Sequence, residues 1–251
     1  MKNVYKFYNN SGWKNINNLT RDAELFEDNR KYAKKYVSKC RRRILEFIPK
    51  KGINLLDFAS GPIQYKEYLE YSKNFKIRHC VDFSKTAIKI AKKKLRNKGK
   101  YYCKNILKIT FPNNFFDCVV SLHTIYHINK SDQEKVIKKL LNISKKGAPV
   151  IIVYSNPDPI IKKLYSIFFK KKKTNSLYFY PHKLRWWKKF EKHAEIKIYC
   201  WRSFSSKHQK ILFPNNIIGK YMLDILYYFE TRYPHFFGSF FQYPLIILKK
   251  K

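Results

Sequence analysis

The feature that most restricts the fold of this chain is an alternation of short apolar runs with polar, helix-period stretches from Gly52 to Tyr154. Polar stretches of about ten to fifteen residues between apolar runs are typical of strand–helix–strand units around a buried parallel sheet. The pattern predicts strands at 53–58, 77–82, 100–103, 115–121 and 149–154, with helices at 64–73, 84–97 and 131–145. We therefore expect an α/β, doubly wound, mostly parallel sheet of the Rossmann-like type.

The C-terminal region adds two strands and a lid. Pro157 and Pro159 break the alternation after Tyr154. Beyond them the pattern predicts helices at 160–169 and 181–193, and strands at 195–204 and 240–248 that bring the sheet to seven strands. The stretches 155–180 and 205–239, the second rich in aromatic residues, are expected to form a lid inserted in the C-terminal half.

The N-terminal region predicts a helical arm. Residues 1–19 are polar with scattered aromatic side chains, a pattern typical of a segment that lies on the rest of the molecule, and residues 21–48 have the apolar spacing of one helix. The chain thus divides into an arm and helix at 1–51, a first half of the sheet at 52–154, and the remaining strands with the lid at 155–251.

Composition excludes several classes of protein. The chain has 251 residues, of which 45% are hydrophobic, enough to bury a core and too many for a disordered chain. Neither a signal peptide nor a run of ~18 apolar residues is recognised. None of the five cysteines forms a Cys-x-x-Cys pair, so we expect neither a disulfide framework nor a zinc knuckle: Cys40, Cys80, Cys103, Cys118 and Cys200. We therefore expect a soluble, cytoplasmic protein.

The formal net charge of +37 has two interpretations. Such a charge is typical of proteins that bind nucleic acid or another anionic surface. However, 44 of the 54 basic residues are lysines spread over the whole chain beside abundant Asn, Ile, Tyr and Phe, as expected from an A+T-rich coding sequence. Base and phosphate recognition depends more on arginine, so we favour the compositional explanation and leave an anionic partner open.

Two acidic residues at strand ends indicate a binding site. Asp57 ends an apolar strand and is followed by the small-residue turn Ala59-Ser60-Gly61, where a ligand can approach the main-chain N–H groups. Asp82 ends the next strand 25 residues later (82 − 57), where a carboxylate can accept both hydroxyls of a ribose. The structural alternative is that Asp57 holds the turn and that Asp82 caps the following helix.

From Gly52 to Tyr154 the chain resembles the class I S-adenosylmethionine-dependent methyltransferases. Asp57 matches the acid of the family's first motif, and Ala59, Gly61 and Ile63 stand where the family has three alternating glycines. The loss of two glycines argues against a dinucleotide pyrophosphate but is tolerable for a cofactor without a phosphate. The resemblance implies S-adenosylmethionine as cofactor, held at this end of the sheet by Asp57, Ala59, Ser60, Gly61, Pro62, Asp82 and Phe83.

The resemblance continues after the third and fourth strands. Asn105 stands where the family has an acid that bonds the adenine amino group, and Ile106 where the next residue packs on the ring. The stretch 111–123 resembles the family's fourth strand and its approach turn, so that Leu122 and His123 would line the methionine arm. Tyr126 and His127, which follow it, would face the acceptor.

The resemblance implies O- or N-methylation of a small-molecule acceptor. Such a transfer needs a positioned lone pair and exclusion of water, and His127, or second His123, has a suitable intrinsic pKa to remove a proton. The acceptor is expected between the lid and the arm, against Tyr5, Tyr8, Trp13 and Tyr126.

Three alternatives stay open at this stage. Either histidine can have a purely structural role, packing against its neighbours or orienting the loop. His123 and His127 are four residues apart, a spacing that two metal ligands on a helix can have, but no third ligand is found, so we expect no metal site. The basic surface is compatible with an RNA or DNA methyltransferase, although no Asn-Pro-Pro-Tyr-like tetrad for a flipped base is present. The two missing glycines are compatible with an inactive methyltransferase-fold binding protein. The oligomeric state is not indicated.

Overall fold

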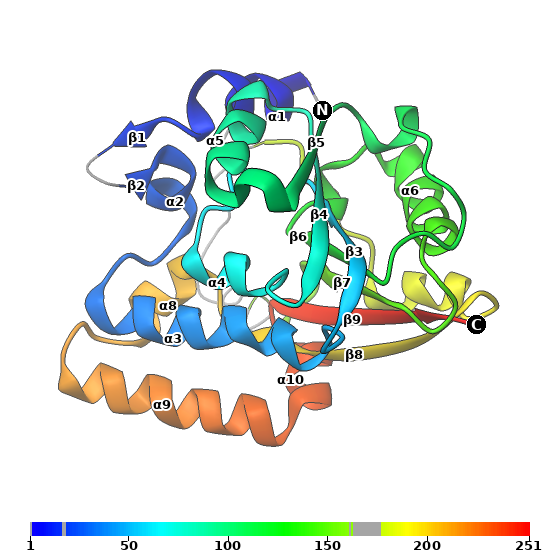
Figure 1. Ribbon diagram of the computed structural model, residues 1–251. Coiled ribbons are helices and arrows are strands. Elements are labelled where there is room, and N and C mark those ends of the chain that lie inside the picture. Colours follow the sequence, from blue (N-terminus) through cyan, green and yellow to red (C-terminus); the bar gives the residue numbers. More distant parts are fainter. Residues whose placement is uncertain (1, 17–18, 161, 163–176) are drawn as a thin grey trace.

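The computed structural model describes residues 2–16, 19–160, 162 and 177–251 of the chain. Its centre is a seven-stranded sheet in the order β5-β4-β3-β6-β7-β9-β8 (Figure 1). β3, β4, β5, β6 and β7 are parallel to one another, and β9 is antiparallel to both β7 and β8. The expected α/β fold with a mostly parallel sheet is therefore confirmed. The strands are β3 (Gly52–Phe58), β4 (Phe75–Asp82), β5 (Gly99–Cys103), β6 (Cys118–Leu122), β7 (Pro149–Val153), β8 (Ala194–Arg202) and β9 (Tyr243–Lys250).

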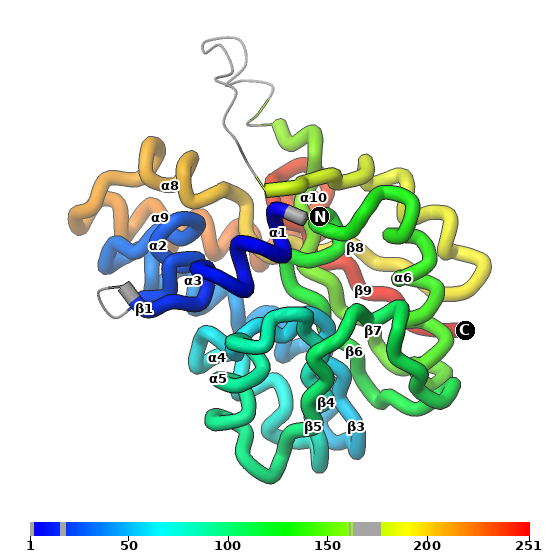
Figure 2. Tube along the Cα trace, turned by 90° about the horizontal axis from the view of Figure 1, so that it is seen from above, coloured from blue at the N-terminus to red at the C-terminus, as the bar shows by residue number. Residues whose placement is uncertain are grey.

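The parallel strands need crossover connections, which three helices supply: α4 (Lys66–Glu70), α5 (Lys85–Leu95) and α6 (Lys130–Ile143). α5 begins at a cap, because the Ser84 hydroxyl accepts the N–H of Ala87 at 3.2 Å. Figure 2 shows α4 and α5 on one side of the sheet and α6 on the other, so the sheet is doubly wound.

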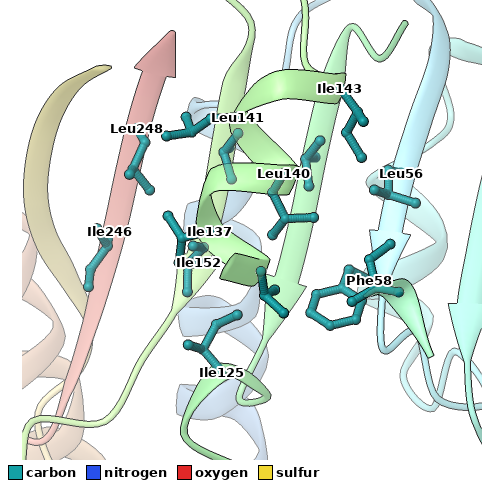
Figure 3. Packing of buried hydrophobic residues seen from close by; sticks show 14 of the residues in the cluster. Leu56, Phe58, Ile125, Ile137, Leu140, Leu141, Ile143, Ile152, Ile246 and Leu248 are labelled. Atoms are coloured by element: carbon teal, nitrogen blue, oxygen red, sulfur yellow. The ribbon is translucent and has the colours of Figure 1, made fainter. Parts of the chain in front are cut away.

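Alternate residues of the central strands fill a core on each face of the sheet. On one face, Leu56 and Phe58 of β3 pack with Ile152, Leu248 and the apolar side of α6, including Leu140 (Figure 3). On the other face, the neighbouring residues of the same strands contact the N-terminal helices, α4 and β8. This second cluster contains Ile44, Leu55, Tyr71, Phe75, Cys118, Val120, Ile151, Val153, Trp201, Leu245 and Ile247.

The single helix predicted at 21–48 is wrong, because polar side chains interrupt it. α2 (Arg21–Phe26) ends at Glu27, whose backbone is extended, and α3 (Lys31–Arg42) continues into the 3-10 turn η2 (Arg43–Glu46). Between the helices the Asp28 carboxylate accepts the backbone N–H of Arg30 at 3.3 Å and its guanidinium at 2.7 Å. These local bonds compete with the helical backbone bonds.

The arm ahead of α2 is short and mostly helical, as expected. It consists of α1 (Lys2–Phe7), the π-helical turn η1 (Tyr8–Gly12) and the two-stranded ribbon β1 (Asn15–Ile16) and β2 (Leu19–Thr20). The Ser84 hydroxyl donates to the carbonyl of Tyr8 at 3.1 Å and so ties the arm to the start of α5. Figure 2 shows α1 lying across one end of the sheet.

The C-terminal half differs from the lid predicted at 205–239. This segment forms α8 (Ser206–Leu212), α9 (Ile217–Arg232) and α10 (Pro234–Phe240), and α9 runs beside α3 (Figure 1). Glu230 of α9 is buried, accepts the Tyr36 hydroxyl at 2.6 Å, and pairs with Arg43 at 2.9 Å. Buried charge and apolar contacts to α3 therefore direct α9 away from the cavity described below.

Several predicted elements differ in extent. The strand predicted at 115–121 begins only at Cys118, because the Asp117 carboxylate accepts the backbone N–H groups of Ile53 and Asn54 at 2.9 and 2.8 Å. The helix predicted at 64–73 is reduced to α4, and that at 181–193 is the 3-10 segment η6 (Leu184–Phe190). The helix predicted at 160–169 lies almost entirely outside the described residues. Other short turns are η3 (Arg96–Lys98), η4 (Ile106–Lys108) and η5 (Ile125–His127).

No helix within the described ranges combines the length and the apolar character needed to cross a bilayer.

Candidate active site

The carboxyl ends of β3, β4 and β6 open into a cavity of about 730 Å³. The arm closes one side of it through Val4, Phe7, Tyr8 and Trp13, and α2 contributes a second wall. Ligands of open α/β sheets bind at this end of the strands, and the volume lies in the range of small-molecule sites. Of the predicted site residues, those that line the cavity are Asp57, Ala59, Ser60, Gly61, Pro62, Asp82, Phe83, Leu122, His123, Tyr126, His127, Tyr8 and Trp13.

The turn after β3 has an unusual backbone. Ala59, Gly61 and Ile63 all have positive φ angles, of 57°, 55° and 50°. At these three positions the methyltransferase family that the sequence resembles has alternating glycines. The left-handed conformation explains why glycine suits them. In Ala59 and Ile63 the same conformation costs about 1–2 kcal/mol each, so the turn is strained.

Asp82 makes the capping bond of the structural alternative and also reaches the cavity. One carboxylate oxygen accepts the N–H of Gly61 at 2.9 Å and the other accepts that of Ser84 at 2.8 Å, so Asp82 holds both the turn and the start of α5. It also lines the cavity. Burial raises the pKa of Asp82 to about 6, so it is mostly ionised at neutral pH and has lone pairs left to accept ribose hydroxyls.

Asp57 forms a buried ion pair beneath the turn. Its carboxylate accepts the Arg78 guanidinium through Nη2 at 2.5 Å and Nε at 3.1 Å. Both side chains are almost completely buried. The charge of Asp57 is therefore compensated by the protein itself, although the residue reaches the cavity wall.

Asn105, Ile106 and Tyr5 are not brought to the cavity. Asn105 turns its side-chain oxygen back to accept the N–H of Leu107 at 2.9 Å, which caps η4. Ile106 is 2% exposed and belongs to the core against α6. Tyr5 is 55% exposed and contacts the ring of Phe83 from outside, with 5.5 Å between centroids. Local capping and core packing thus take up the residues predicted at the adenine position.

His127 is oriented as a proton acceptor. Its Nδ1 lies 2.7 Å from the carbonyl oxygen of Tyr178, which can only accept, so Nδ1 carries the proton and Nε2 bears the lone pair in the neutral ring. Burial lowers the pKa of His127, which favours this neutral form.

His123 is held more tightly. It has a φ of 55°, its Nδ1 lies 3.0 Å from the Tyr126 hydroxyl, and its ring packs edge-on against Trp201. Burial lowers its pKa well below the usual range. Its second contact, to the ring of Tyr243, completes an aromatic enclosure that fixes its orientation.

Trp13 covers the strained turn. A Cβ placed on Gly61 would lie 3.2 Å from the end of the Trp13 indole, so the ring rests on the glycine. Trp13 also stacks on Tyr8, with 4.9 Å between ring centroids and 28° between planes. The arm therefore contacts the turn itself.

Several lining residues were missed in the sequence. Asp22 accepts the Tyr8 hydroxyl at 3.0 Å, and Glu27 bridges Arg41 at 3.3 Å and Arg202 at 3.1 Å. They lie in the segment predicted as one helix, and Arg202 lies 175 residues after Glu27. The only signal in the sequence for Asp22 and Glu27 is that acidic residues are rare in this basic chain, which has 17 of them in all.

Comparison with known proteins agrees with this geometry. Residues 56–152 match the family described as a methyltransferase domain. Over 125 residues the chain is 28% identical to the ubiquinone/menaquinone biosynthesis C-methyltransferase UbiE of Francisella tularensis subsp. novicida (strain U112), covering 46% of this chain and 49% of that protein. The chain thus spans about half the length of the curated relatives that it matches.

Two solved structures show the same fold. A SAM-dependent methyltransferase from Archaeoglobus fulgidus superposes with a TM-score of 0.54 at 17% identity, covering 86% of this chain and 94% of that one. Phosphoethanolamine N-methyltransferase 1 of Haemonchus contortus, solved with phosphoethanolamine and S-adenosylhomocysteine, gives 0.60 at 12% identity, covering 99% and 48%. Residues 56–152 therefore form a methyltransferase domain, and the sheet and the strand-end cavity have the fold of the class I S-adenosylmethionine-dependent methyltransferases, whose members use S-adenosylmethionine as cofactor.

Proposed function

We propose that this protein transfers a methyl group from S-adenosylmethionine to an oxygen or nitrogen atom of a small-molecule acceptor. The observation that carries the proposal is one cavity lined by the strand-end residues, by both histidines and by the aromatic arm. A space partly enclosed by Tyr8, Trp13 and Tyr126 suits a small apolar or aromatic molecule better than a polymer.

The residues present fit the cofactor. Asp82 offers a carboxylate to a ribose, Phe83 lies beside it, and the turn at Ala59 and Ser60 brings backbone into the cavity. We assign these residues, with Gly61, Pro62 and Leu122, to cofactor binding. When bound, S-adenosylmethionine supplies a methyl group on a positively charged sulfur, which a lone pair can displace in line.

The contribution of the protein is then mainly positional. The arm and Tyr126 would exclude water and hold the acceptor atom about 3 Å from the methyl carbon. A hydroxyl or ammonium acceptor must lose a proton, and the Nε2 lone pair of His127 is assigned to accept it. His123, enclosed by aromatic rings, is assigned a second, orienting role.

The charges of the site argue against a nucleic acid acceptor. Among the described residues, the cavity is lined by four carboxylates, by Arg202, which is paired with Glu27, and by no lysine, so it offers a phosphate backbone no unpaired cation. Six of the ten arginines are engaged in ion pairs within the chain and are not free to fork phosphates: Arg30, Arg41, Arg42, Arg43, Arg78 and Arg202.

A binding and transfer assay tests the proposal. Calorimetry with S-adenosylhomocysteine measures cofactor binding, and labelled S-adenosylmethionine follows transfer to a panel of phenols, amines and total RNA. We expect S-adenosylhomocysteine to bind and label to enter an O- or N-acceptor. Absence of binding would support an inactive scaffold, salt-sensitive labelling of RNA would support a nucleic acid enzyme, and labelling only at carbon would contradict the assigned acceptor atom.

A further inference from the structure

The cavity has the opposite electrostatic character to the rest of the chain. In a protein of formal net charge +37, it is lined by Asp22, Glu27, Asp57 and Asp82, and the only lysine or arginine lining it among the described residues is Arg202. Low-dielectric walls of one sign of charge attract ligands of the other sign. A carboxylate without a cation partner in the protein is the one that can bind a cationic ligand.

Two of the four are paired with cations, and a third is occupied by backbone N–H donors. Asp57 is paired with Arg78, and Glu27 is paired with Arg41 and Arg202. Asp82 accepts two backbone N–H groups and stands at the position assigned to the ribose. Asp57 and Glu27 therefore need no further cation, and the proposed function assigns Asp82 to the cofactor.

Asp22 is different. Its only hydrogen bond within the described residues is the one that Oδ1 accepts from the Tyr8 hydroxyl at 3.0 Å, and it makes no ion pair there. Burial raises the pKa of Asp22 to about 6, so at neutral pH it is a carboxylate in a partly desolvated position. A carboxylate in such a place gains more from a cation than from another neutral donor.

The surroundings of Asp22 suit an organic cation. The stacked rings of Tyr8 and Trp13 and the side chain of Phe26 line the same cavity, and aromatic faces attract ammonium groups. Within the described part of the chain no group of three metal-ligating side chains is found, so a metal ion is a poorer match.

We infer that Asp22 binds a positively charged nitrogen of the methyl acceptor, so that the acceptor belongs to the class of basic amines. This inference rests on the proposed function and deepens it. Asp22 lies on α2, in the wall formed by the N-terminal region, whereas the residues assigned to the cofactor follow β3 and β4. The cofactor also carries an ammonium group, so the experiment must separate the two.

A probe series of one size and three charges provides the test. Calorimetry at pH 7.5 compares 2-phenylethylamine, 2-phenylethanol and phenylacetate, with and without S-adenosylhomocysteine, on the wild type, on Asp22→Asn and on Asp224→Asn. Asp224 is an exposed acid on α9 that pairs with Lys39, and it serves as the matched control. S-adenosylhomocysteine binding by itself reports on the proposed function and on the folding of each variant.

We expect the amine to bind the wild type about tenfold or more tightly than the alcohol, and the anion to bind worst. Asp22→Asn should remove this preference and leave the alcohol and S-adenosylhomocysteine within about twofold, while Asp224→Asn changes none of them. The inference is overturned by equal binding of amine and alcohol to the wild type, by an unchanged amine affinity in Asp22→Asn, or by an equal loss of S-adenosylhomocysteine affinity, which would assign Asp22 to the cofactor. Failure of S-adenosylhomocysteine to bind the wild type would instead overturn the proposed function.

Discussion

The carboxylate of Asp82 accepts the backbone N–H of Gly61 at 2.9 Å, and this bond ties the end of β4 to the turn after β3. The two strands are neighbours in the sheet, so the acid at the end of β4 also fixes the backbone of the turn after β3. The same carboxylate lines the cavity. Under the proposed function, Asp82 would therefore couple cofactor binding to the shape of the turn.

Asp82→Ala should weaken S-adenosylhomocysteine binding by roughly 2–4 kcal/mol, because charge-assisted bonds to the ribose are lost and the turn loses its acceptor. Calorimetry measures this, with Asp224→Ala as the control. In the wild type the affinity should also fall as the pH drops through about 6, since the raised pKa means that Asp82 becomes protonated there. An unchanged affinity in Asp82→Ala would remove Asp82 from the site.

Two opposite substitutions test the strain in the turn. Gly61→Ala should lower the free energy of unfolding by about 1–2 kcal/mol, because its φ is +55° and the new Cβ would meet Trp13 at 3.2 Å. Ala59→Gly should raise it by up to about 1 kcal/mol, because the left-handed backbone at Ala59 is relieved. Denaturant unfolding measures both.

The matched control for Gly61 is Gly147, which has a φ of +75° and no neighbouring atom within 4 Å of a built Cβ. Gly147→Ala should lower the free energy of unfolding only through backbone strain and should leave S-adenosylhomocysteine affinity unchanged. Gly61→Ala should reduce that affinity. Equal effects of the two variants on both quantities would show that Trp13 and the turn contribute nothing specific.

Arg78→Met should destabilise the fold by about 3–5 kcal/mol, because it leaves the buried carboxylate of Asp57 without its cation. The double variant Asp57→Asn with Arg78→Met should be more stable than Arg78→Met alone, since no buried charge remains. Arg42→Met is the control: its ion pair with Glu70 is exposed and should contribute no more than about 1 kcal/mol. Similar losses in Arg78→Met and Arg42→Met would contradict this account.

His127→Ala and His127→Gln should reduce kcat by about 10²–10⁴-fold and leave S-adenosylhomocysteine affinity nearly intact, because a lost proton acceptor affects the reaction rather than binding. Burial lowers the pKa of His127, so the neutral base persists and the wild-type rate should be level from pH 9 to about 6.5 and decline only below. His193→Gln, at an exposed position, serves as the control. A wild-type-like rate and pH profile in both His127 variants would leave this histidine a structural part.

Much of the fold could be predicted from the sequence because its signals are local. The five parallel strands lie within a few residues of the predicted ranges, since buried strands between helix-period stretches need apolar residues wherever they stand in the sheet. Asp57, Asp82 and the turn between them were predicted at one end of the sheet for the same reason: parallel strands bring their carboxyl ends to a common edge.

Other parts depended on local bonds that periodicity does not report. The break between α2 and α3 follows from the hydrogen bonds of Asp28 and Arg30, and Asn105 is diverted by its own capping bond. Hydrophobic spacing averages over ten or more residues and is insensitive to one carboxylate or amide that satisfies a nearby N–H.

The sequence alone determined the class of fold, the strand ends that carry the acids, and the family that these residues resemble. Only the tertiary structure decided which distant segments close the cavity: α2 brings Asp22, β8 brings Arg202, and α9, aromatic-rich and predicted as lid, packs on α3 instead. The physical reason is that an apolar or charged side chain specifies that it needs a partner but not which one. That choice depends on long-range packing such as the buried Glu230 network, which joins residues nearly 200 positions apart.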